Sequence, residues 1–235
     1  MTTAEVLKEL QALGSESTKK TLLKHGAKEP FYGVKVEDLK KVMKKIKGDQ
    51  DLALDLYKTG VSDAMYLAGL VADGSKMSKK DLQAWAKGAN WYMISEYTVP
   101  WVTCESPYAW ELAQEWIDSK DEKIATVGWS TLSNLLSVTP DADIDAKLMA
   151  KLVARIKKDI QKAPNRVRYT MNGFLICLGC YYTPMTADAL KAAKEIGVVM
   201  VDMGGTACKV PSVPDYIEKV KKRGALGKKK KTAKC

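Results

Sequence analysis

An aromatic cluster surrounds a single carboxylate within residues 90–101. Trp91 and Tyr92 are adjacent, Glu96 follows four residues after Tyr92, and Trp101 completes the cluster. Residues four apart lie on one face of a helix, so Tyr92 and Glu96 are expected to share a face. Aromatic rings attract cations through their π faces, and a carboxylate stabilises positive charge that develops close by. The cluster could therefore bind a cationic ligand or stabilise a cationic transition state.

One reaction that suits this cluster is hydrolysis of a glycosidic bond whose base already carries a positive charge. N-alkylated purines are such bases, and a positively charged purine leaves without a strong general acid. Trp91 and Tyr92 would stack on the altered nucleotide, and Glu96 would stabilise the sugar cation and position a water. The alternative is that the tryptophans are core residues and that Glu96 is a surface or capping carboxylate.

A second candidate group is basic. Residues 155–168 carry six basic residues against one acid, Asp159. Part of this group follows a proline turn at the expected start of a helix, where backbone N–H groups and guanidinium groups both favour phosphate. A solvated basic face is the alternative. The residues predicted to contact phosphates are Lys158, Lys162, Arg166 and Arg168.

The remaining motifs carry less chemistry. Cys177 and Cys180 have the spacing of a metal or redox pair, but they lie within a helical pattern and have no second pair or neighbouring histidine. The single histidine, His25, falls at a predicted helix end. Residues 198–210 predict a short extended segment with a glycine turn. We therefore expect neither a metal site nor a cofactor.

Apolar residues recur at helical spacing along nearly the whole chain, whereas alternating strand patterns are scarce. The pattern predicts an all-α fold of antiparallel helix pairs that stack into a curved α-solenoid of the HEAT kind. No clean sequence repeat is present, so a compact helical bundle is the alternative. The helix over residues 90–99 is expected to stop before Pro100, because a residue preceding proline disfavours the helical conformation. The predicted helices cover residues 3–13, 17–25, 36–47, 51–57, 62–71, 78–87, 90–99, 106–118, 121–138, 145–162, 165–182, 187–196 and 214–223.

The chain has 235 residues, 46% of them hydrophobic, which is enough for a single helical-repeat domain over residues 1–222. Of the net charge of +10, nine charges fall in residues 219–235, which contain no acid. We expect residues 223–235 to form a flexible basic tail that binds polyanions or is simply solvated. No apolar run approaches the roughly 20 residues of a membrane span. The odd set of five cysteines and the missing secretion signal predict a cytoplasmic protein with reduced thiols.

Two blocks of the sequence resemble the DNA alkylation repair family, the AlkD-like alkylpurine DNA glycosylases. One is Trp91-Tyr92-x-x-x-Glu96-x-x-Val99-Pro100, and the other covers residues 166–174. The resemblance extends over about residues 5–222. It implies HEAT-like repeats whose concave basic face holds double-stranded DNA. It also implies removal of cationic N3- or N7-alkylated purines without base flipping, metal or cofactor, in contrast to most enzymes that act on bases.

The candidate catalytic residues depart from the family pattern. Active members carry two adjacent tryptophans and an aspartate four residues after the second. Trp91 matches the first tryptophan, Tyr92 replaces the second, and Glu96 replaces the aspartate. A later family tryptophan falls near Phe174, which we therefore add to the expected DNA contacts.

These residues predict a monomeric, nucleoid-associated DNA-binding protein and, more specifically, a glycosylase of the type that releases 3-methyladenine or 7-methylguanine from DNA. One alternative is a catalytically degenerate binder of damaged or branched DNA on the same scaffold. Another is a helical-repeat scaffold for a protein partner, with the aromatic cluster as a peptide or methylated-lysine site.

Overall fold

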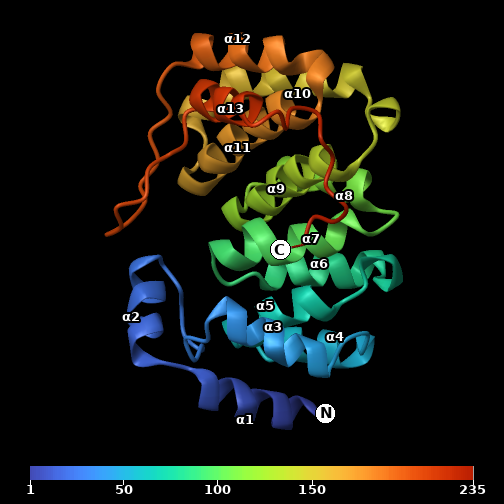
Figure 1. Cartoon of the computed structure of the whole chain (residues 1–235), viewed down its shortest axis with the longest axis vertical. Helices are drawn as coiled ribbons and strands as arrows, with labels where there is room; N and C mark the ends of the chain where they lie inside the picture. Colours follow the sequence, from blue (N-terminus) through green and yellow to red (C-terminus); the bar gives the residue numbers. More distant parts are fainter. Residues whose placement is uncertain (235) are drawn as a thin grey trace. The chain divides into compact units, whose positions relative to one another are not determined.

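A computed structural model of the chain describes residues 1–234, and all regular secondary structure within them is helical. Figure 1 follows the helices in chain order. The predicted all-α class is confirmed, and most predicted helices match the observed bounds to within a few residues. The helices are α1 (Thr3–Leu13), α2 (Glu16–Lys24), α3 (Val36–Lys45), α4 (Gln50–Lys58), α5 (Ser62–Val71), α6 (Lys79–Gly88), α7 (Val99–Cys104), α8 (Ala109–Ile117), α9 (Glu122–Val138), α10 (Ala146–Asp159), α11 (Asn165–Tyr181), α12 (Thr186–Ile196) and α13 (Val213–Lys222).

Local sequence signals explain many of these helix ends. The Ser78 side chain accepts a hydrogen bond from the Asp81 backbone N–H at 3.1 Å, which confirms Ser78 as the cap of α6. Thr2 and Glu5 form a reciprocal capping box at the start of α1. The Ser212 side chain accepts a hydrogen bond from the Asp215 N–H at the start of α13, and a proline occupies the first turn of that helix. These caps satisfy backbone N–H groups that a helix start leaves without an intrahelical partner.

The described chain packs as two compact units within the region that we predicted as one domain. The first consists mainly of residues 1–109 and the second mainly of residues 110–202 and 208–233. In the first unit α5 is central, and all ten of its residues are buried. A Cβ atom on Gly69 of α5 would lie 2.5 Å from the Thr98 side chain. Glycine at this position therefore allows residues 90–101, which we call the aromatic segment, to pack directly on α5.

A buried acid fastens the loop before α3 to the start of α5. Asp63, which is 5% exposed, accepts hydrogen bonds from the backbone N–H groups of Tyr32 and Val34 at 2.5 and 2.8 Å. These bonds satisfy two donors of a loop that lacks regular structure, and an unsatisfied buried donor would cost about 1–3 kcal/mol. Asp63 thus holds the loop in place through both of its carboxylate oxygens.

The second unit is built around α9 and α11, two helices of 17 residues that pack against each other. At their contact Trp129 and Phe174 are both fully buried, and their rings meet edge to face with centroids 5.6 Å apart. Phe174 is therefore a core residue. Our expectation that it contacts DNA is wrong, because the neighbouring helix covers its ring completely.

The basic C-terminal segment contacts the ends of helices. In the second unit, Gly227 and Lys230 donate backbone hydrogen bonds to the carbonyls of Cys180 and Ser137, both at 2.8 Å. The Lys229 ammonium donates to the Leu136 carbonyl at 2.9 Å. Carbonyls near a helix C-terminus lack intrahelical donors and attract cations, which explains these contacts. Because the contacts anchor the backbone at Gly227 and Lys230, they do not fit the expectation of a flexible tail.

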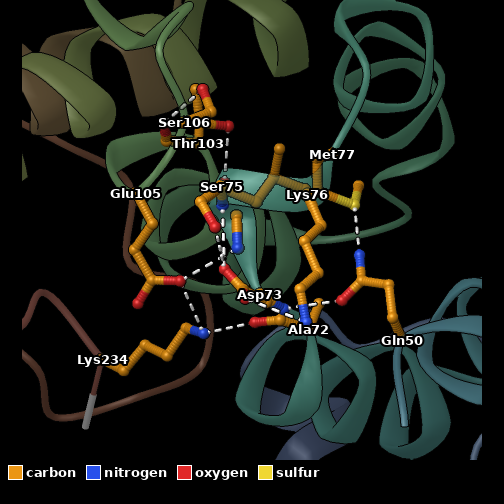
Figure 2. A network of polar contacts seen from close by, with 12 residues as sticks. Gln50, Ala72, Asp73, Ser75, Lys76, Met77, Thr103, Glu105, Ser106 and Lys234 are labelled. Atoms are coloured by element: carbon orange, nitrogen blue, oxygen red, sulfur yellow. Dashed lines mark hydrogen bonds and ion pairs between the residues drawn. The ribbon is translucent and has the colours of Figure 1, made fainter. Parts of the chain in front are cut away.

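The last described residue, Lys234, is held within the first unit. Figure 2 shows its ammonium between the Ala72 carbonyl, at the end of α5, and the Glu105 carboxylate, 2.9 Å away. The same Glu105 oxygen accepts the backbone N–H of Gly74 at 3.1 Å. The side chain of Lys234 is 17% exposed, so this ion pair is partly shielded from solvent.

Candidate nucleic-acid interface

The structure brings Trp91 and Tyr92 together and buries Glu96. The rings of Trp91 and Tyr92 have centroids 5.1 Å apart at an interplanar angle of 56°, and both residues are partly exposed. Glu96 is 6% exposed. Trp101 is 2% exposed and packs edge to face against Tyr66, so it belongs to the core. Of the four residues in the cluster, only the adjacent pair is accessible to a ligand.

The aromatic segment continues through Pro100 as one helical run, contrary to our prediction. A π-helical turn at Ile94–Thr98 leads directly into α7, with Pro100 in its first turn. The Val99 N–H donates to the Ile94 carbonyl, five residues back. Proline lacks an N–H and clashes with the carbonyl four residues before it, and the wider turn relieves that clash. Glu96 therefore lies inside a continuous helix packed on α5 and not at an exposed helix end.

Asn90 fixes the start of the aromatic segment. Its side-chain amide donates to the Gly60 carbonyl at 3.2 Å and to the Ser62 hydroxyl at 2.8 Å, just before and at the start of α5. Trp91 follows directly and lines a cavity of about 50 Å³ beside Leu22 and Phe31. Ligand pockets are commonly about 300–1,000 Å³. The cavity next to Trp91 is therefore far too small for a base, and any nucleotide would have to contact the outside of the aromatic pair.

Three of the predicted phosphate contacts lie where α10 gives way to α11. Lys158 and Lys162 are exposed and form no ion pair with any residue that the structure describes. Arg166 lies in the first turn of α11, with its guanidinium 4.3 Å from the centre of the Tyr169 ring. The Arg166 backbone N–H donates to Glu122 at 2.6 Å, so this carboxylate caps the helix. The side chains of these three residues remain candidates for binding phosphate.

Arg168 has a different role from the one we expected. Its guanidinium donates to the carbonyls of Met200 and Ala163 at 2.7 and 3.0 Å. Both acceptors are backbone carbonyls of the second unit, so the guanidinium is occupied by bonds within the protein. Arg168 is therefore committed to holding the backbone in place, and we remove it from the proposed phosphate contacts.

Arg168 is one of three polar side chains that hold an extended arm, residues 197–202, which follows α12. Gln161 donates to the carbonyls of Ile196 and Val198 at 3.2 and 3.0 Å. Asn165 both donates to the Asp202 carbonyl and accepts its N–H, each at 2.8 Å. Together these side chains supply the hydrogen bonds that a neighbouring strand would give. The spacing of Gln161, Asn165 and Arg168 was visible in the sequence, but their acceptors lie more than 30 residues away.

The cysteine pair does not have the properties of a redox or metal site. Burial raises the pKa of the Cys177 thiol to about 12 and that of Cys180 to about 11, so both remain protonated at neutral pH. Among residues 1–234, no cluster of three or more His, Cys, Asp or Glu side chains could hold a metal ion. None of the described helices is long and apolar enough to cross a membrane.

Comparisons with known proteins agree with this architecture. Residues 6–197 match the family model described as DNA alkylation repair enzyme. Two relatives, uncharacterized protein Lin0241 of Listeria innocua and uncharacterized protein Lmo0209 of Listeria monocytogenes, are each 33% identical over 221 residues, covering 92% of this chain and 95% of theirs.

One solved structure is described as a new family of proteins related to the HEAT-like repeat DNA glycosylases with affinity for branched DNA structures. It is 38% identical, with a TM-score of 0.92 over 100% of both chains. The HEAT-like repeat fold predicted from the sequence is therefore confirmed.

Proposed function

The chain belongs to the DNA alkylation repair enzyme family, and on that premise we propose that it binds branched DNA through the phosphate backbone and does not excise bases. The observation that carries this proposal is the burial of Glu96, which is 6% exposed. A carboxylate that stabilises a sugar cation must reach the reacting nucleotide. Here the carboxylate belongs to a helical turn packed on α5, so the proposed role of the segment is binding and not catalysis.

Two further observations support binding of branched DNA. The solved structure that is 38% identical to this chain is described as having affinity for branched DNA structures. In this chain, Lys158, Lys162 and Arg166 offer cations for phosphates, while Trp91 and Tyr92 offer partly exposed rings. Unpaired or unstacked bases at a branch point stack readily on aromatic rings. We propose that phosphate contacts supply most of the affinity and that the rings contact bases at the branch.

Binding should be measured with three-way and four-way junctions and with linear duplex of the same total length, over a series of salt concentrations. We expect tighter binding to the junctions and a steep loss of affinity with salt, because each phosphate contact releases counterions. Equal affinity for junctions and linear duplex would contradict the proposed preference for branches. Undetectable binding to any DNA at low salt would contradict the function as a whole.

A second candidate function is excision of cationic alkylpurines, favoured by the accessible Trp91–Tyr92 pair with ring centroids 5.1 Å apart. Methylated duplex DNA should be incubated with the wild-type protein and with Glu96→Gln, and released 7-methylguanine and 3-methyladenine should be quantified. We expect no release above the protein-free control. Release by the wild type that falls by about 100-fold or more in Glu96→Gln would establish the enzyme and overturn the non-catalytic proposal.

A further inference from the structure

Helix α2 is unusual because none of its nine residues, all of which the structure describes, is buried. A surface helix of a globular protein normally buries an apolar stripe, and that burial supplies most of its stability. An isolated helix of this length is unstable in water. Other contacts must therefore hold α2 in position, and the side chains that it presents to solvent are free for another role.

Close backbone contacts at the start of α2 hold it against the following loop. The Ser15 N–H donates to the Gly33 carbonyl at 3.2 Å. Gly33 has a φ of +77°, and a Cβ there would lie 2.7 Å from the backbone nitrogen of Lys19. A Cβ on Gly14 would lie 2.5 Å from the Tyr32 carbonyl oxygen. Only glycine allows these segments to approach so closely. In Figure 1, α2 lies at one side of the first unit with this loop beside it.

One lysine of α2 takes part in this docking. The Lys19 ammonium lies 2.7 Å from the Glu29 carboxylate and 5.2 Å from the centre of the Phe31 ring. Its side chain is 27% exposed. Lys19 therefore faces the loop, and the helix has a defined orientation in which its other side is turned to solvent.

After Glu16 in its first turn, α2 and the residues that follow it up to Lys28 carry only positive charge. Residues 17–28 contain four lysines and one histidine but no acid. Lys20, Lys24 and Lys28 are exposed, and none of them forms an ion pair with a described residue. Lys20 and Lys24 are four apart and share one face, about 6 Å apart along the helix. We call these three residues the α2 basic surface.

We propose that the α2 basic surface binds the phosphate backbone of one duplex arm of a branched DNA. This inference rests on the proposed function and adds a contact surface in the first unit. A branched DNA has several duplex arms, and Lys158, Lys162 and Arg166 provide phosphate contacts in the second unit only. Backbone docking at Gly14 and Gly33 holds the lysines at a defined place, which lowers the entropic cost of binding. A polyanion is the occupant that matches three unpaired ammonium groups.

The test neutralises the α2 basic surface in the full chain. The triple variant Lys20→Gln, Lys24→Gln, Lys28→Gln is compared with a control, Lys44→Gln, Lys47→Gln, Lys80→Gln, which removes three exposed and unpaired lysines from the same unit. Binding to a three-way junction is measured over a salt series, and circular dichroism checks that both variants are folded. We expect the α2 variant to lose about 10–100-fold in affinity at low salt. We expect the slope of log affinity against log salt to become about 2–3 units shallower, because each lost phosphate contact removes about 0.9.

The two proposals fail in different ways. If the wild type binds no junction, the proposed function is wrong. If the wild type binds the junction but the α2 variant keeps the wild-type affinity and salt slope, only the α2 surface is wrong. An equal loss in the α2 variant and the control would also overturn this inference, because the effect would then follow from net charge and not from position.

Discussion

Glu96 and Trp91 illustrate how the placement of single side chains separates binding from catalysis. Glu96 carries the charge that a glycosylase would need, yet it is 6% exposed within a continuous helical run. Trp91 is partly exposed, but the cavity beside it is about 50 Å³, too small for a base. Aromatic rings that remain at the surface can still stack on unpaired bases. The side chains that a ligand can reach are therefore suited to binding bases and not to catalysis.

The thiols provide a test at this scale. Burial raises the pKa of Cys177 to about 12 and of Cys180 to about 11, whereas Cys208 is exposed. At pH 8 thiols with these raised pKa values are at most about 0.1% ionised, and Cys208 is accessible to the reagent, so Cys177 and Cys180 should be alkylated by iodoacetamide at least about 100-fold more slowly than Cys208. Peptide mass spectrometry in a Cys235→Ser background would measure the rates, and comparable rates would contradict the burial.

The same raised pKa values make the free energy of unfolding depend on pH. Unfolded thiols ionise near pH 8.5, whereas the folded thiols keep their protons to higher pH. The unfolded state therefore binds fewer protons above about pH 8.5, and the free energy of unfolding should fall as the pH rises beyond that value.

At the element scale, the arm over residues 197–202 is held by polar side chains and not by a second strand. Gln161 lies in the short 3-10 turn that follows α10, and Asn165 and Arg168 lie in the first turns of α11. They fix an arm on which Val198 is 78% and Met200 is 69% exposed. An exposed apolar segment would be expected to fold back unless its backbone were anchored. The three side chains provide that anchor.

Asn165→Ala should release the arm without unfolding the unit. The variant loses both 2.8 Å hydrogen bonds to Asp202. At about 1 kcal/mol for each bond, hydrogen exchange at the Asp202 amide should accelerate by about 30-fold. Gln114→Ala, which removes a bond to the Trp110 carbonyl within α8, is the matched control and should leave the arm unchanged. Wild-type exchange rates in Asn165→Ala would show that Asn165 does not hold the arm.

At the scale of the whole molecule, the charge of the C-terminal segment serves the fold. Lys229 contacts the Leu136 carbonyl near the end of α9 and lies 2.9 Å from Asp141. Lys234 contacts the Ala72 carbonyl at the end of α5. Helix C-termini carry partial negative charge and unsatisfied carbonyls, and cations there are stabilising. Two of the nine basic residues in residues 219–235 therefore contact the ends of helices.

A pair of matched variants tests this stabilising role. Lys229→Gln with Lys234→Gln removes the two lysines whose side chains are 20% and 17% exposed. The free energy of unfolding should fall by about 2 kcal/mol, because two charge-assisted contacts near helix ends are lost. Lys228→Gln with Lys231→Gln removes the same charge at exposed positions and should change stability by less than about 0.5 kcal/mol. Urea unfolding followed by tryptophan fluorescence measures both, and equal midpoints for the two variants would contradict the role.

The sequence by itself determined the class of the fold and the bounds of most helices. Helical periodicity, caps such as Ser78 and glycines at helix ends depend on residues within one or two turns, so they can be read directly from the chain. It also determined that Trp91 and Tyr92 are neighbours and that residues 198–210 interrupt the helical pattern. These features need no knowledge of distant parts of the chain.

Only the tertiary structure decided which of these side chains are accessible. Pro100 predicted a helix end, yet packing of the segment on Gly69 of α5 accompanies a π turn that buries Glu96. Phe174 resembled a DNA contact but fills the core beside Trp129, and Arg168 resembled a phosphate ligand but binds Met200. Exposure and hydrogen-bond partners in these examples depend on residues 29 or more positions away. Local propensity carries no information about such contacts.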